Sequence, residues 1–178
     1  MKTIKYLGGP TIIAILACIC QIIDQIIGAP LGVALGVDIA SGGWMAFIGW
    51  ACYFLAGCDI KGGAKVMISA IIAIIASTAI IFSGVNILAG LGFWAFPISI
   101  LFWVIPTIAT EKITMNIVPV LFITAGIFFS MPNPDYTAIS SYVSLGAYEL
   151  VYVFLGCVLG YFTILIRGAY DAKYNSAE

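Results

Sequence analysis

Long apolar runs separated by short polar connections make up most of this chain. A run of about 20 apolar residues is long enough to cross the hydrocarbon core of a bilayer as an α-helix. Six runs read as spans are present, at residues 8–28, 42–57, 64–83, 88–109, 113–131 and 145–166. The pattern predicts an all-α polytopic membrane protein, whose single domain over residues 1–178 is a bundle of six transmembrane helices.

The first apolar run carries a polar stripe. Its polar and small residues follow one another at spacings of three and four, which places them on one face of a helix. They are Thr11, Ala14, Cys18, Gln21, Gln25 and Gly28. The opposite face is rich in isoleucine, which lipid tolerates. We interpret this run as a membrane helix packed in a bundle, with Asp24 beside the polar stripe.

Two segments near the start need separate interpretation. The lysines before the first run are typical of a signal peptide, but the apolar run continues to Ile27, so we interpret it as an uncleaved span. The connection 29–41 is apolar yet too short to cross a bilayer. It is either a re-entrant segment lining a cavity or a short helix at the outer interface.

Further along, Pro97, Pro106 and Pro119 indicate bends in the fourth and fifth runs.

Composition narrows the possible functions. The chain is 63% hydrophobic and 8% charged, whereas a soluble domain carries about a quarter charged residues. There is no histidine and the net charge is −1, so we expect no nucleic-acid partner, no metal and no cofactor. The five cysteines include no CxxC pair, and we interpret them as packing residues. No catalytic motif is present, and we expect no enzymatic activity.

The cationic residues predict the orientation in the membrane. Every lysine and arginine falls before the first run, after the sixth, or in the second and fourth connections. The connections at 29–41, 84–87 and 132–144 contain none. Cationic loops stay on the cytoplasmic side of a membrane. We therefore expect both termini to be cytoplasmic.

Two acidic residues lie inside the predicted spans. Asp24 and Glu149 each lie about four residues from the outer end of a run, which is about 6 Å deep at 1.5 Å per residue. The predicted outer side has no cationic residue to neutralise them. We expect a substrate or ion path in which Gln21 and Gln25 donate to the carboxylates, with an aromatic lining of Trp44, Trp94, Tyr148 and Tyr152. The alternative is ordinary interfacial placement of aromatic and hydrated acidic side chains.

The sixth run contains a GxxxG pattern formed by Gly156 and Gly160. Such a pair lets two helices approach closely, and the facing helix belongs either to the same chain or to a second copy. We expect helix packing at these two glycines and a homo-oligomer in the lipid bilayer. The alternative interpretation is packing within one chain.

The second run and its connection carry a recognisable pattern. Over residues 44–65 the chain has Trp44, Phe47, Gly49, Tyr53, Phe54 and Gly57, followed by Lys61 to Gly63. This pattern resembles a family of small bacterial inner-membrane proteins catalogued as domain of unknown function 1097. The resemblance implies a multi-pass protein of the bacterial cytoplasmic (inner) membrane. It assigns neither a substrate nor functional residues.

Three functions remain compatible with these observations. The first is a channel or carrier that moves a small-molecule solute across the bacterial cytoplasmic membrane. The second is the membrane-embedded substrate-binding subunit of a multi-component vitamin uptake transporter. Such subunits have a regular alanine stripe on their first span, and here that stripe is polar. The third is a structural membrane subunit without a substrate.

Overall fold

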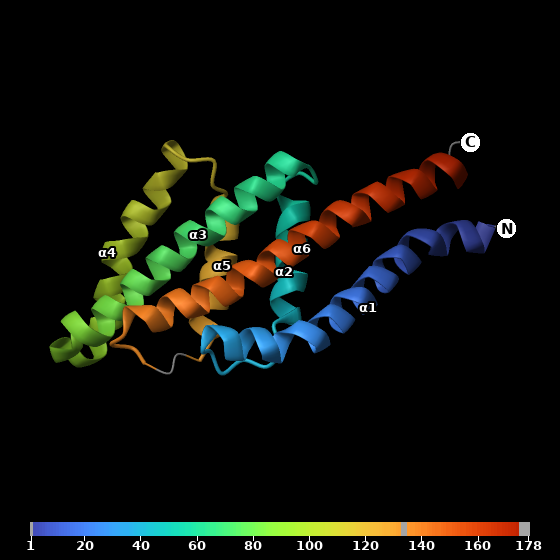
Figure 1. Cartoon of the computed structure of the whole chain (residues 1–178). Helices are drawn as coiled ribbons and strands as arrows, with labels where there is room; N and C mark the ends of the chain where they lie inside the picture. Colours follow the sequence, from blue (N-terminus) through green and yellow to red (C-terminus); the bar gives the residue numbers. More distant parts are fainter. Residues whose placement is uncertain (1, 133–134, 175–178) are drawn as a thin grey trace.

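Six α-helices occupy the six apolar runs, so the predicted all-α fold is confirmed. The structure is a computed structural model that describes residues 2–132 and 135–174. The helices, shown in Figure 1, are α1 (Lys2–Leu35), α2 (Gly43–Leu55), α3 (Ile60–Phe82), α4 (Ala95–Ala109), α5 (Val118–Ser130) and α6 (Ile139–Tyr174). Within the predicted connection 132–144, residues 133–134 lie outside the described residues.

The helices differ greatly in length. Among the described residues, four apolar helical segments are long enough to cross a membrane: Leu7–Leu35, Ile60–Ile87, Ala89–Lys112 and Ile139–Tyr174. In contrast, α2 and α5 have 13 residues each, which is about 20 Å of helix against a hydrocarbon core of about 30 Å. The chain therefore has the character of a membrane protein. The crossing of the bilayer by α2 and α5 stays a prediction.

Glycine contacts define how α1 and α2 lie against α6. A Cβ atom added to Gly8 would meet Tyr170, and one added to Gly28 would meet the hydroxyl of Tyr152, so α1 runs antiparallel to α6. Gly42, just before α2, lies against Tyr152, and Tyr53 near the end of α2 lies against Gly160. Therefore α2 runs parallel to α6 and antiparallel to α1.

The other three helices form a second group in which α3 is central. The Ser69 hydroxyl of α3 accepts a hydrogen bond from the Ile117 amide at the start of α5 (2.8 Å). At its other end, α3 continues into one π-helical turn whose Ser83 lies 2.7 Å from Ser99 of α4 and accepts from the Trp103 indole (3.0 Å). These polar contacts hold both helices against α3. In Figure 1 successive helices alternate in direction, with the α2–α3 and α4–α5 connections on one side and the other three connections on the opposite side.

The core follows α6, which packs on α1, α2, α3 and α5. Several of the largest fully buried side chains of the described chain belong to this helix, among them Tyr142, Tyr148, Tyr152, Leu145 and Glu149. By contrast, only Ala95 and Ser99 of α4 are buried. One long helix therefore organises the bundle, and α4 lies at its edge.

The connection 29–41 contains no separate short helix. The helix α1 continues through Pro30 to Leu35 and is followed by Gly36, whose φ of +68° is the left-handed conformation that glycine adopts readily. Insertion of this connection into the membrane as a re-entrant segment stays a prediction. The Gly36 amide donates to Val33 and the Val37 amide to Gly32, which together form a Schellman motif. Residues 37–42 then fold back beside the last turns of α1, since the Ala40 carbonyl oxygen lies near Gly28.

The prolines of the fourth and fifth runs act differently from the predicted bends. Pro97 and Pro119 lie in the first turns of α4 and α5, where a proline costs no helical hydrogen bond. Pro106 alone lies deep inside α4. The break in the fourth run occurs instead at Gly92, whose φ of +52° interrupts the short 3₁₀ segment Ala89–Trp94 that precedes α4.

The face that α1 turns toward the bundle also differs from the polar stripe. Among its described side chains the buried residues are Leu16, Cys20, Asp24, Gly28 and Gly32, each four residues apart. Of the predicted stripe only Gly28 is buried, and the other members are exposed. The reason is Asp24: its carboxylate finds hydrogen-bond donors only on the bundle side, and this places the neighbouring glutamines outside.

Candidate functional site

Asp24 is the hydrogen-bonded centre of a buried cluster. Its side chain is 1% exposed although it lies in a long apolar helix. One carboxylate oxygen accepts from the Tyr152 hydroxyl of α6 (2.6 Å) and from the Gly42 amide (2.9 Å). The other accepts from the Ser41 hydroxyl (2.5 Å). Every donor comes from a different part of the chain than α1.

This arrangement caps α2 from a distance. The residue before α2, Gly42, has no side chain to satisfy the free amides of the first helical turn. The Asp24 carboxylate supplies the missing acceptor, and its negative charge lies at the positive end of the helix dipole. The fold itself therefore supplies hydrogen-bond donors to the Asp24 carboxylate, and Gln21 and Gln25, the donors expected from the sequence, are not among them.

Three glycines make room for this contact. A Cβ atom on Gly42 would lie 2.3 Å from the Tyr152 ring, and one on Gly28 would lie 2.5 Å from the Ala40 carbonyl oxygen. A Cβ atom on Gly43 would lie 3.0 Å from the Asp24 carboxylate. Larger residues at these positions would push the connection 37–42 away from α1 and α6.

Glu149 presents the opposite situation. It is 0% exposed, and neither carboxylate oxygen has a hydrogen-bond partner within the described part of the chain. On α6 it lies between Gly146, which packs on Ile74 of α3, and Val153, which packs on Gly49 of α2. Glu149 thus lies on the side of α6 that faces α2 and α3, and a carboxyl group is costly to bury unpaired.

Two tyrosines connect these acidic residues along α6. The rings of Tyr148 and Tyr152 lie 5.1 Å apart, and both residues are 0% exposed. Tyr152 donates to Asp24, whereas the Tyr148 hydroxyl has no partner among the described residues. The structure therefore brings together Asp24, Tyr148 and Tyr152, with Glu149 on the same turn of α6.

The depth of this cluster along the helices differs from the sequence-based expectation. Because α6 begins at Ile139, Glu149 lies ten residues into the helix, about 15 Å along its axis. Because α1 continues to Leu35, Asp24 lies eleven residues before its end. Both acids are thus much farther from their helix ends than the expected 6 Å. They still lie near one level, because Asp24 contacts the turn of α6 that follows Glu149.

The other expected members do not join the cluster. Gln21 and Gln25 are exposed and donate no hydrogen bond to Asp24. Trp44 is 42% exposed at the start of α2. Trp94 is 61% exposed in the 3₁₀ segment Ala89–Trp94, which packs on α4 and on the π-helical turn. Interfacial placement of the two tryptophans, the alternative interpretation, agrees better with this exposure.

Sequence reasoning missed Ser41 and Gly42 as donors to Asp24. Ser41 ends a connection without hydrophobic periodicity and Gly42 opens the predicted second run, so neither position indicated a contact with the first run. One signal was available: serine followed by glycines directly before an apolar run is typical of a helix start.

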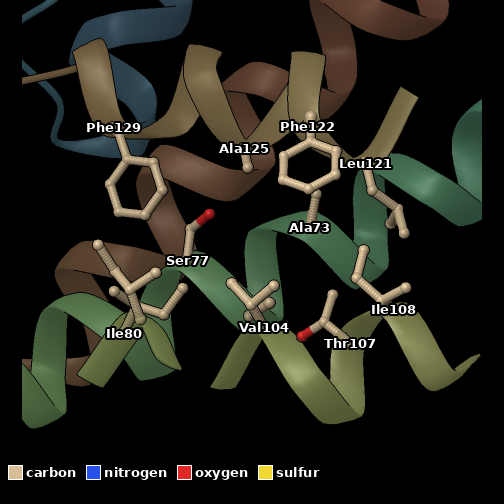
Figure 2. A pocket seen from close by; sticks show the side chains of 12 residues that line it. Ala73, Ser77, Ile80, Val104, Thr107, Ile108, Leu121, Phe122, Ala125 and Phe129 are labelled. Atoms are coloured by element: carbon tan, nitrogen blue, oxygen red, sulfur yellow. The ribbon is translucent and has the colours of Figure 1, made fainter. Parts of the chain in front are cut away.

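A separate cavity lies between α3, α4 and α5, and it is also a feature that the sequence did not indicate (Figure 2). Its volume is about 160 Å³. The cavity exists because α4 and α5 pack on α3 far more than on each other. The lining is apolar except for the Thr107 hydroxyl, which donates to the Trp103 carbonyl, and the buried Ser77 hydroxyl, which has no partner among the described residues. A cavity of this size and polarity suits a small apolar group and not a charged one.

The buried acidic residues and the apolar cavity suggest different chemistry. Within the described residues, no group of three or more histidine, cysteine, aspartate or glutamate side chains lies close enough to hold a metal ion. All five cysteines are free, with Cys20, Cys52 and Cys157 buried. Glu149 is the acidic residue that is buried without a hydrogen-bond partner among the described residues, and we take it as the centre of the candidate site.

Comparisons with known proteins give one match. A family model described as protein of unknown function (DUF1097) matches residues 13–168, which is most of the chain. In the comparisons with curated proteins and with solved structures, nothing matches.

Proposed function

The chain belongs to the DUF1097 family, and from its membrane character and its buried acid we propose that it carries a small polar or cationic solute across a bacterial cytoplasmic membrane. Glu149 is proposed to bind the solute or the proton that accompanies it. The observation that supports this proposal is the complete burial of a carboxyl group without a hydrogen-bond partner among the described residues.

Such a group is expensive inside a membrane. A carboxylate at depth needs a proton, a cation or hydrogen-bond donors, and ionisable residues retained there commonly serve transport. The chain has no histidine, and its lysines and arginines all belong to one side in the predicted topology. A guest from outside the chain is therefore the natural partner for Glu149.

Burial also favours a carrier over an open channel. Glu149 is sealed from solvent, so a solute reaches it only when helices separate. The connection 37–42 is held on α6 through Asp24 and Tyr152, one turn from Glu149. We propose that release of this contact opens the site toward the outer side, and that α2 and α6 move apart during the opening.

The test uses purified protein in vesicles that contain a pH-sensitive dye. Small amines, small neutral polar solutes and monovalent cations are added in turn under an imposed pH gradient, and the change of internal pH is recorded. Wild-type protein is expected to accelerate the response to at least one of these solutes. Glu149→Gln, which keeps the shape and removes the charge, is expected to lower that rate about tenfold or more.

Two matched variants serve as controls. Glu149→Asp keeps the carboxylate and is expected to retain part of the rate, and Glu111→Gln changes an exposed acid at the end of α4 and is expected to retain all of it. Wild-type rates in Glu149→Gln would contradict the proposed role of this residue. Co-purification of a coupling membrane protein with ATPases would favour the substrate-binding subunit instead.

A further inference from the structure

The outer face of α1 carries amide side chains that the fold leaves unsatisfied. This helix lies at the edge of the bundle and packs on α6 and α2 through Leu16, Cys20, Asp24 and Gly28. On the exposed side lies a row that we call the α1 stripe: Thr11, Ala14, Cys18, Gln21 and Gln25.

The two glutamine side chains have no hydrogen-bond partner where lipid covers them. Gln21 lies midway along the apolar segment Leu7–Leu35, and Gln25 follows one turn later. Neither side-chain amide has a hydrogen bond within the described part of the chain, whereas Thr11 donates to the Leu7 carbonyl (2.8 Å). Hydrocarbon offers no donor or acceptor, so these amides need a polar partner outside the chain.

We propose that the α1 stripe is the surface through which a second copy of this chain binds, α1 against α1. A glutamine amide both donates and accepts, so the stripe is complementary to itself, and hydrogen bonds between glutamines on facing helices stabilise membrane dimers. Ala14 and Cys18 are small enough for the two helices to approach closely.

The remaining surfaces support this choice. The GxxxG pair expected to meet a second copy is already covered, since Cβ atoms on Gly156 and Gly160 would strike Ala46 and Tyr53 of α2. The alternative interpretation of that motif, packing within one chain, is therefore confirmed. The other exposed row of α1 is Ile15, Ile19, Ile22 and Ile26, which suits lipid.

Symmetry then determines which residues meet. Two copies inserted in the same direction are related by a two-fold axis along the membrane normal, so their α1 helices run parallel and in register. Each stripe residue therefore faces its own counterpart. Cys18 lies in the middle of the stripe and is exposed, so the two Cys18 thiols lie near the axis.

Native membranes that contain the full chain with Cys18 as its single cysteine test this arrangement. The remaining cysteines are replaced by alanine at Cys20, Cys52, Cys58 and Cys157, and copper-phenanthroline oxidation is followed by gel electrophoresis. We expect a disulfide-linked dimer. In the matched control the single cysteine is moved to Ile19, on the isoleucine row, and we expect about tenfold less dimer.

Equal cross-linking at both positions, absence of a dimer at Cys18, or a cross-link from Cys18 to a different protein would each overturn the proposal. A second variant pair is independent of thiol chemistry. Gln21→Leu with Gln25→Leu keeps α1 apolar and helical, and it is expected to lower the dimer fraction in lipid vesicles about tenfold, as counted by single-molecule photobleaching. Ile19→Leu with Ile22→Leu is expected to leave that fraction unchanged. A dimer that persists in the glutamine variant overturns the proposed surface.

Discussion

Asp24 and Glu149 are both acidic residues in apolar helices, but the fold treats them differently. Asp24 accepts three hydrogen bonds from Ser41, Gly42 and Tyr152, while Glu149 accepts none from the described residues. At this scale Asp24 is a structural residue that caps α2 from another helix. For Glu149, a role in binding a solute or a proton stays a proposal.

Removal of the Asp24 carboxylate is expected to destabilise the fold. Asp24→Ala leaves three donors without an acceptor, two of them buried (the Gly42 amide and the Tyr152 hydroxyl), which costs about 2–4 kcal/mol of the free energy of unfolding. Tyr152→Phe removes only one donor and is expected to cost about 1 kcal/mol. Denaturant titration of the purified protein in micelles measures both values. A stability for Asp24→Ala equal to that of wild type would show that the carboxylate does not cap α2.

At the scale of elements, α2 and α6 approach until their backbones touch. A Cβ atom on Gly156 would lie 2.2 Å from the Ala46 carbonyl oxygen, and one on Gly49 would lie 2.6 Å from the Val153 carbonyl oxygen. Close packing at Gly156 and Gly160 was predictable from their spacing. The identity of the facing helix was not, because GxxxG specifies a small surface without specifying its partner.

Gly156→Ala tests this contact with one added methyl group. The new Cβ atom can only be accommodated if α2 moves, and we expect a loss of about 1–3 kcal/mol in the free energy of unfolding. Gly168→Ala, on the same helix, has nothing within 4 Å of the added atom and is expected to be neutral or slightly stabilising. The same denaturant titration compares the two. Equal stability of both variants would contradict the packing described for α2 and α6.

At the scale of the whole molecule, the alternation of helix directions agrees with the distribution of charge. The starts of α1 and α3 and the ends of α4 and α6 lie on one side of the bundle, and all lysines and arginines belong to these regions. This agreement supports the prediction that both termini are cytoplasmic, because cationic segments resist translocation.

Labelling from outside the cell tests the topology. In a chain without native cysteines, Asp38→Cys lies in the connection after α1 and Glu111→Cys lies between α4 and α5; both positions are exposed. A membrane-impermeant maleimide is expected to label the first variant in intact cells and the second only after permeabilisation. Labelling of both from the same side would contradict an even alternation of six spans.

The amino-acid sequence by itself determined the all-α class and the apolar runs in which the six helices form, while the membrane side of the cationic residues stays a prediction. These properties depend on local composition, since apolar runs become helices in lipid and charged residues separate them. Helix ends were less predictable. The continuation of α1 through Pro30 to Leu35 depends on the terminating motif at Gly36 and on packing against the returning segment.

Tertiary structure alone decided which face of α1 is buried and which acid is satisfied. The donors to Asp24 lie 17, 18 and 128 residues away along the chain, so no local pattern could reveal them. Because the Asp24 carboxylate faces the bundle, the angle of 100° between successive helix residues places Gln21 and Gln25 on the exposed side of α1. A helix has a single rotation about its axis, and the buried hydrogen bonds of one residue set the exposure of all the others.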